Sequence, residues 1–210
     1  MKLLLDISLI LNIIIICCEI LILKKVKKKI NIIKYYTFLQ NFLALIVSCI
    51  FSVYLIIAIF SNRTIPEFIK GLRYVVTCGL TATMFIYLIF LSSKSKNVMG
   101  EEDFKSNLNP KIANFILHYF VPIISLLSFL IFERQISLNQ PKWTGFAAIP
   151  SCLYWIIYAI LSTTNLWEEP YDLTLTKRKG IKGKYLLDIL VMITIPLSFV
   201  LISYILWNIK

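Results

Sequence analysis

The chain alternates between long apolar segments and short polar segments that are rich in lysine. Each apolar segment has about the length that a helix needs to cross a bilayer, roughly 20 residues. The pattern predicts six transmembrane helices, at Leu3–Leu23, about Tyr35–Phe60, about Phe68–Ser92, Ile112–Phe132, about Phe146–Ser162 and Tyr185–Trp207. We therefore expect an all-α, polytopic membrane protein in which residues 1–210 form a single transmembrane domain.

Positive charge is distributed unevenly between the two sides of these segments. The loops that follow the first, third and fifth segments hold fifteen of the 22 lysines and arginines. Lysine and arginine concentrate on the cytoplasmic side of membrane proteins. The count predicts that these three loops are cytoplasmic, that both termini are extracytoplasmic, and that the protein lies in the cell membrane.

Composition narrows the classes of protein further. The chain is 59% hydrophobic with a mean hydropathy of +0.80, which exceeds the apolar content of soluble domains. Its net charge of +11 lies in loops between spans, so we expect membrane lipid and not nucleic acid as its partner. One histidine and five cysteines without a CxxC pair give no ligand set for zinc or iron–sulfur, and we expect no metal and no cofactor.

Several charged residues within the apolar segments have a simple structural interpretation. Asp6, Arg73 and Asp188 lie near predicted helix ends, where a long or short polar side chain can reach water. Glu19 lies near the cytoplasmic end of its segment, with Lys24 close by in the sequence. We expect these four side chains to be structural.

Two pairs of polar residues do not fit that interpretation. Thr37 and Asn41 are four residues apart, as are Asn114 and His118, so each pair shares one helix face. Both segments begin on the predicted cytoplasmic side, and His118 lies roughly 9 Å into its helix at 1.5 Å per residue. The four side chains are therefore expected in one slab of the inner leaflet, and Thr37 meets His118 if the two helices adjoin.

Pro122 adds a local feature next to the histidine. Because proline lacks an N–H, the carbonyl of His118 loses its helical partner, and we expect a kink that opens the helix there. A freed carbonyl in hydrocarbon needs another partner or a water, and a wet pocket would suit hydrolysis. The alternative is an ordinary proline kink without a function.

A threonine beside a histidine is a candidate nucleophile with a general base. Imidazole can accept the proton of the Thr37 hydroxyl as it attacks an ester carbonyl. We therefore take Thr37 and His118 as the candidate catalytic residues. Asn41 and Asn114 are the candidates for binding the substrate or the oxyanion.

Two short runs resemble a known family. The run YTFLQN from Tyr36 to Asn41 resembles the "F-T-x-x-x-N" helix start of the androgen-induced family of membrane proteins and its bacterial relatives. The run LHYFVP from Leu117 to Pro122 resembles its "L-H-x-x-x-P" segment, and PSCLY from Pro150 to Tyr154 is a looser match. The bacterial relatives often end the first run in Q-S-N, which this chain does not, and that departure leaves the substrate open.

The resemblance implies a function. It implies a membrane-embedded threonine hydrolase whose essential threonine and histidine correspond to Thr37 and His118. The animal members cleave esters of fatty acids with hydroxy fatty acids, so the expected function is hydrolysis of lipid esters. Isoleucine- and lysine-rich composition suggests a bacterial source.

Two other functions fit a six-span chain of this length. One is the substrate-binding subunit of a small-molecule importer, although the first segment lacks the alanines and glycines with which such subunits pack on a partner. The other is a non-catalytic membrane scaffold, in which the polar faces of Thr37 and His118 point to different neighbours.

Overall fold

A computed structural model describes residues 2–25, 35–91, 109–133, 138–163 and 184–209. These residues are almost entirely helical and contain no strand, which confirms the predicted all-α class. The α-helices are α1 (Lys2–Lys25), α2 (Tyr36–Ser61), α3 (Glu67–Ile86), α4 (Pro110–Phe115), α5 (Val121–Leu127), α6 (Lys142–Thr163) and α7 (Lys184–Ile209). Three π-helical turns interrupt or extend them, at η2 (Tyr87–Leu91), η4 (Ile116–Phe120) and η5 (Ser128–Phe132).

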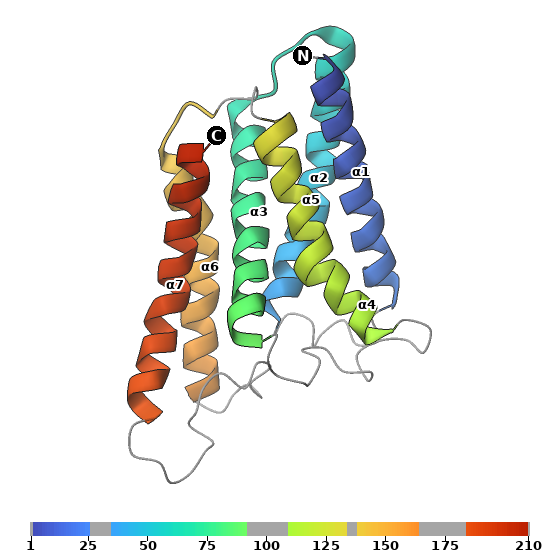
Figure 1. Ribbon diagram of the computed structural model, residues 1–210. Helices are drawn as coiled ribbons and strands as arrows, with labels where there is room; N and C mark the ends of the chain where they lie inside the picture. Colours follow the sequence, from blue (N-terminus) through green and yellow to red (C-terminus); the bar gives the residue numbers. More distant parts are fainter. Residues whose placement is uncertain (1, 26–34, 92–108, 134–137, 164–183, 210) are drawn as a thin grey trace.

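Helix α3 stands in the middle of the bundle (Figure 1). It packs against α2 and α5 on one side and against α6 and α7 on the other, while α1 packs against α2 and α5. The start of α1 and the end of α7 lie at the same end of the bundle, which is the upper end in Figure 1. We call this the upper end and the opposite one the lower end.

Capping residues explain where several helices begin and end. The Asn109 side chain accepts a hydrogen bond from the Lys111 backbone N–H at 2.9 Å, and Pro110 occupies the first helical position, so α4 begins there. Helix α2 ends at Asn62, which has a φ of 51°. Asparagine tolerates this left-handed conformation, which stops a helix.

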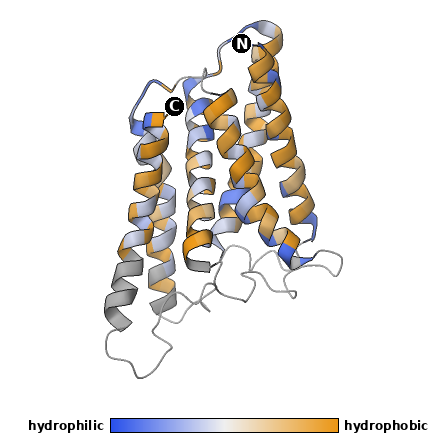
Figure 2. Ribbon diagram, in the orientation of Figure 1, coloured by the Kyte–Doolittle hydropathy of each residue, from blue (hydrophilic) through white to orange (hydrophobic). Residues whose placement is uncertain are grey.

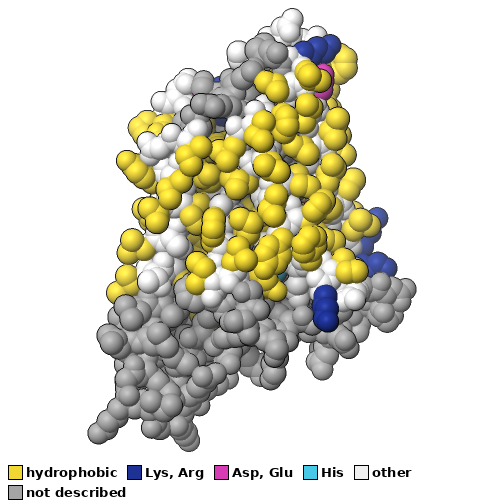
Figure 3. All heavy atoms as spheres, viewed as in Figure 1, with side chains coloured by type: hydrophobic (Ala, Val, Ile, Leu, Met, Phe, Trp, Pro, Cys, Tyr) yellow, Lys and Arg dark blue, Asp and Glu magenta, His cyan; other side chains and the backbone are white. Residues whose placement is uncertain are grey.

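Four helical stretches in the described part of the chain are long and apolar enough to cross a membrane, at Lys2–Lys25, Tyr36–Ser61, Glu67–Ile89 and Lys111–Phe132. Helix α7 adds a described apolar stretch, Ile193–Ile209. Hydrophobic residues predominate along the helices (Figure 2), and their side chains cover most of the face in Figure 3. The bundle is therefore suited to a membrane, while six crossings remain a prediction.

The helix that carries His118 contains a π-helical turn, which the sequence did not predict; the sequence predicted a kink near Pro122. The chain passes from α4 into the π-helical turn η4 and then into α5, and the Val121 N–H bonds the Ile116 carbonyl five residues back. A π-helical turn inserts one extra residue into a helix and occurs often at functional sites. The irregularity that we expected at Pro122 is thus a widened turn that contains the histidine.

Two glycines allow close packing on α3. A Cβ atom at Gly79 would collide with the carboxamide of Gln40 from α2, and one at Gly71 would collide with the indole of Trp143 from α6. The absence of a side chain at these positions lets both neighbours approach the α3 backbone. These contacts help to fix α2, α3 and α6 around the polar residues described next.

Candidate functional site

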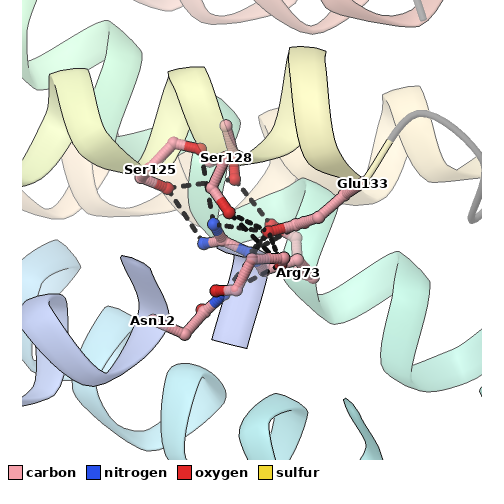
Figure 4. Close-up of polar contacts among 7 residues, drawn as sticks. Asn12, Arg73, Ser125, Ser128 and Glu133 are labelled. Atoms are coloured by element: carbon pink, nitrogen blue, oxygen red, sulfur yellow. Dashed lines mark hydrogen bonds and ion pairs between the residues drawn. The ribbon is translucent and has the colours of Figure 1, made fainter. Parts of the chain in front are cut away.

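A cluster of buried polar residues joins α1, α3 and the α5–η5 segment in the upper half of the bundle (Figure 4). At its centre, the Arg73 guanidinium donates from Nε to both carboxylate oxygens of Glu133 at 3.1 Å. The two side chains are only 1% and 2% exposed, and theirs is a buried ion pair. We call the group the upper cluster, and it consists of Ser8, Asn12, Arg73, Thr77, Ser125, Ser128 and Glu133.

The upper cluster is almost fully hydrogen-bonded. Glu133 also accepts from Ser8, Asn12 and Ser128, the last at 2.6 Å. The remaining guanidinium nitrogens of Arg73 donate to the hydroxyl and the carbonyl of Ser125, at 2.9 and 3.3 Å. A buried ion pair is tolerated when its remaining hydrogen-bonding capacity is met in this way.

This arrangement corrects one prediction. The sequence placed Arg73 near a helix end, with a side chain that reaches water. Arg73 instead points into the bundle, where it pairs with Glu133 and lies over the Phe51 ring at 5.7 Å. The reason is that an acidic partner and serine hydroxyls lie within its reach inside the protein, so exposure is unnecessary.

Two apolar clusters divide the lower half of the bundle into levels. The cluster nearer the lower end joins α1, α2, α4 and η4, and consists of Ile22, Phe38, Ala113 and Leu117. The next one toward the middle adds α3 and α5, and consists of Ile15, Ala44, Val47, Val76, Leu80 and Val121. Along their helices, Asn41 and His118 lie between these two clusters, whereas Thr37 and Asn114 lie next to residues of the lower one.

Helices α1 and α2 each place one buried polar side chain between the two clusters. On α1, Glu19 lies between Ile15 and Ile22 on the buried face. On α2, Asn41 lies one turn after Phe38 and one turn before Ala44.

The α4–η4 segment supplies the other two. Asn114 follows Ala113, and His118 follows Leu117 and precedes Val121 by one turn. We call Glu19, Asn41, Asn114 and His118 the lower layer. All four are at least nine-tenths buried, with exposures of 1% to 3%.

The lower layer is marked by missing hydrogen bonds. In the described part of the protein, nine buried side-chain polar atoms lack a hydrogen-bond partner, and five of them belong to this layer. They are Glu19 Oε1, Asn41 Oδ1, both polar atoms of the Asn114 amide, and His118 Nδ1. Buried polar atoms are nearly always paired, because an unpaired one costs about 1–3 kcal/mol. Their concentration at one level indicates a place that is built to bind polar groups.

Asn41 connects the two candidate catalytic segments. Its amide nitrogen donates to the Thr37 carbonyl at 2.7 Å and to the Leu117 carbonyl, across on η4, at 3.3 Å. The start of α2 thus adjoins the turn that carries His118, as the sequence required for the two to meet. Thr37 is itself buried, with 7% exposure. Among the described residues, the structure has no hydrogen bond between the Thr37 hydroxyl and the His118 ring.

The His118 ring is held by stacking. Its centroid lies 3.9 Å from that of Tyr87, with an interplanar angle of 21°. Tyr87 begins the π-helical turn η2, and its ring also contacts Tyr119 edge-on at 5.4 Å. Stacking fixes the plane of the imidazole while its Nδ1 remains free of a hydrogen bond. A base that is oriented but unpaired remains available for a substrate.

Glu19 is the second corrected prediction. The sequence placed it near the cytoplasmic end of its segment with Lys24 close by, but its exposure is 2%, and neither Lys24 nor Lys25 forms an ion pair with it in the described structure. The physical reason is helical phase. Glu19 shares the buried face of α1 with Ile15 and Ile22, which turns its side chain toward α2 and α4.

The spacing of polar residues along α1 marks the face that carries Glu19. On the largely apolar α1, the polar residues Ser8, Asn12 and Glu19 recur at helical spacing with Ile15 and Ile22. A polar stripe on a membrane helix faces protein, because each polar group is costly in lipid. No comparable signal marks Tyr87, since a tyrosine near a helix end is common at membrane interfaces.

The threonines of α3 bond to their own helix. The hydroxyls of Thr77, Thr81 and Thr83 donate to the carbonyls of Arg73, Thr77 and Leu80 in their own helix. They are thus satisfied locally and lie outside the lower layer. Asp188 lies where the structure describes the helix but not the side chain.

The chemistry open to the lower layer is that of side-chain acid and base groups. Among the residues that the structure describes, no three His, Cys, Asp or Glu side chains come together to hold a metal ion. The layer offers a carboxyl group, two amides, an imidazole and, one turn from Asn41, a hydroxyl. No protein-family model matches the sequence, no curated protein matches it, and no solved structure matches the fold.

Proposed function

We propose that the protein is an intramembrane hydrolase of lipid esters, with Thr37 as the nucleophile and His118 as the general base. The observation that carries the proposal is the lower layer, where five buried polar atoms without partners surround the segment that adjoins Thr37. The resemblance of YTFLQN and LHYFVP to the androgen-induced family supports the same pair.

The proposed reaction uses these side chains in sequence. The Thr37 oxygen bonds to the ester carbonyl carbon as its proton passes to a ring nitrogen of His118. The tetrahedral intermediate collapses, the alcohol leaves with the proton from His118, and an acyl-threonine remains. A water then attacks this acyl group as His118 accepts its proton. The bond between the acyl carbon and the Thr37 oxygen breaks, His118 returns the proton to that oxygen, and the fatty acid departs. The Asn114 amide is the candidate donor to the oxyanion, because its nitrogen has no other partner.

The test is ester hydrolysis by purified protein in detergent. Thr37→Ala and His118→Ala are expected to lower turnover of a hydroxy-fatty-acid ester by a factor of about a hundred or more, the range for a lost base or nucleophile. The matched control is Thr83→Ala, because Thr83 is also a buried threonine and bonds its own helix. Equal turnover by the wild type and both site variants rules the proposal out.

We also propose that the chain crosses the cell membrane six times with both termini outside the cytoplasm. The support is the clustering of lysine in the loops that follow the first, third and fifth apolar segments. In a variant without its five cysteines, a membrane-impermeant maleimide should label Asn62→Cys in intact cells and Ser95→Cys only after permeabilisation. The reverse pattern would mean the opposite orientation. Equal labelling of both positions would mean that they lie on the same side of the membrane, which contradicts a single crossing between them.

A further inference from the structure

The apolar clusters define how α1 and α2 face each other. The cluster nearer the lower end contains Ile22 of α1 and Phe38 of α2, and the next cluster contains Ile15 and Ala44. Residue numbers therefore fall along α1 as they rise along α2, and the two helices pack antiparallel. The residues midway between these contacts lie at the same level of the α1–α2 interface.

Glu19 and Asn41 occupy these midway positions. Their exposures are 2% and 1%, and both side chains lie on the buried faces of their helices. Glu19 Oε1 and Asn41 Oδ1 have no hydrogen-bond partner in the described structure, so the two groups do not bond each other there. An unpaired atom on each side of the interface is available to a third group that comes between the helices.

The orientation of the Asn41 amide is fixed by its neighbours. Its nitrogen donates to the Thr37 carbonyl at 2.7 Å and to the Leu117 carbonyl at 3.3 Å. Carbonyl oxygens only accept, so turning the amide over would set oxygen against oxygen. Asn41 Oδ1 is therefore an acceptor, and a ligand must bring the donor that it needs.

Glu19 supplies the complementary group. No lysine or arginine of the described structure pairs with it, and the buried Arg73 is committed to Glu133. An ionised carboxylate in this position would lose its hydration without a cation to replace it, so the neutral acid is the favoured form. A neutral carboxyl group has one O–H donor and a carbonyl acceptor.

We propose that Glu19 and Asn41 bind a hydroxyl group of the ligand, which accepts a hydrogen bond from the Glu19 carboxyl group and donates one to Asn41 Oδ1. A hydroxyl fits because it accepts and donates at once, whereas an ester or ether oxygen only accepts and leaves Asn41 Oδ1 unpaired. The ligand class is a lipid whose polar part carries free hydroxyl groups, such as a fatty-acid monoester of glycerol. The inference rests on the proposed function only for the ester bond, and the hydroxyl site holds for binding whether or not hydrolysis follows.

Two ethers that cannot be hydrolysed test the site by binding. 1-O-Decylglycerol carries two hydroxyl groups, and decyl propyl ether has the same carbon skeleton without them. Calorimetry with the full-length wild type in detergent should give a Kd at least about tenfold lower for the glycerol ether. A difference of this size is expected when a buried polar group is left unpaired.

Substitutions at Glu19 assign this preference to the site. Glu19→Leu removes the donor, so the preference for the glycerol ether should fall at least about fivefold, the lower end of the range for one lost hydrogen bond. The Kd for decyl propyl ether should stay near the wild-type value, which shows that the variant is folded. Glu19→Gln keeps a donor and an acceptor in the same shape and should retain the preference. Each ether partitions into detergent equally for all three proteins, so a changed preference reports on the site.

The corresponding esters separate this inference from the proposed hydrolysis. In the wild type and Glu19→Gln, kcat/KM should be at least about tenfold higher for 1-decanoylglycerol than for propyl decanoate. In Glu19→Leu most of that difference should disappear. If neither ester is hydrolysed while the ethers show the expected pattern, the proposed function fails and the hydroxyl site stands. If both esters are hydrolysed equally and both ethers bind equally, the hydroxyl site fails and the proposed function stands.

Three binding results overturn the inference. Equal binding of the two ethers by the wild type would do so without any variant. Binding of neither ether would mean that the two side chains take up water only. A preference that Glu19→Leu leaves unchanged would mean that the hydroxyl groups bind elsewhere.

Discussion

The upper cluster and the lower layer are both buried and polar, yet only the first has nearly all of its polar atoms hydrogen-bonded. In the upper cluster, Arg73 and Glu133 neutralise each other, and the surrounding hydroxyls and the Asn12 amide nitrogen complete their hydrogen bonds, so that only Asn12 Oδ1 lacks a partner in the described structure. In the lower layer, Glu19, Asn114 and His118 keep polar atoms without partners. Polar groups that hydrogen-bond one another hold helices together, whereas polar groups without a partner can still bind a ligand. We propose that the upper cluster is structural and that the lower layer is where the chemistry takes place.

The apolar cluster between them keeps the two regions separate. Ile15 and Val121 are completely buried and pack with four other residues of α2 and α3 at the middle level. On the buried face of α1, Ile15 lies between Asn12 of the upper cluster and Glu19 of the lower layer. A change in one polar region is therefore expected to leave the other region's behaviour largely intact.

The largest expected effect is on stability, and it comes from the upper cluster. Arg73→Met leaves Glu133 buried without its cation, which typically costs about 3–5 kcal/mol. Chemical denaturation in detergent, followed by circular dichroism, measures the loss. Arg73→Met combined with Glu133→Gln should recover much of it, since the double variant leaves no unpaired charge.

The control for this prediction is a partly exposed ion pair. Lys70 Nζ lies 4.0 Å from Glu67 Oε2, and the two side chains are 16% and 29% exposed. Lys70→Met should therefore change the free energy of unfolding by only about 0–1 kcal/mol. An Arg73→Met variant no less stable than Lys70→Met would show that the upper cluster does not hold the helices together.

The next prediction concerns the close approach of α2 to α3. Gly79→Ala pushes a methyl group into the Gln40 carboxamide and should cost about 1–3 kcal/mol, the usual range for an overpacked site. Because Gln40 precedes Asn41, the substitution should also reduce ester hydrolysis. Gly145→Ala is the matched control, since a Cβ there has open space around it, and it should leave stability and turnover unchanged. Equal behaviour of the two variants would argue against the tight contact.

The lower layer should respond in the opposite sense. Asn114→Leu removes two unpaired polar atoms from a buried position, and it is expected to raise stability by about 1 kcal/mol. The same substitution should abolish most ester hydrolysis, because it removes the candidate oxyanion donor. Stability that falls as steeply as for Arg73→Met would mean that Asn114 has a structural role like that of the upper cluster.

The smallest effect is expected at the ring beside His118. Tyr87→Phe keeps the stacked ring and should leave stability nearly unchanged, whereas Tyr87→Leu removes the stack, which is worth about 0.5–1.5 kcal/mol. Thermal unfolding of the two variants measures the difference. If Tyr87→Phe is as damaging as Tyr87→Leu, the hydroxyl and not the ring is what His118 requires.

The sequence predicted the helices better than it predicted what they bury. Apolar length located the helical segments and spacing paired Thr37 with Asn41, because both depend on properties of one helix. The partners of Arg73 and Glu19 depend on how helices face one another, and distance from a helix end alone gave the wrong environment for both. The stack of Tyr87 on His118 joins segments 31 residues apart in the chain, and no local pattern specifies it.

The central claim is that the lower layer is reactive and the upper cluster is not, and covalent labelling tests it most directly. An alkyl fluorophosphonate loses fluoride when an activated hydroxyl attacks its phosphorus, and mass spectrometry locates the new bond. We predict an adduct on Thr37 in the wild type and in Thr83→Ala, and none in His118→Ala. Adducts on Ser8, Ser125 or Ser128 of the upper cluster, or undiminished labelling of Thr37 in His118→Ala, would contradict the account.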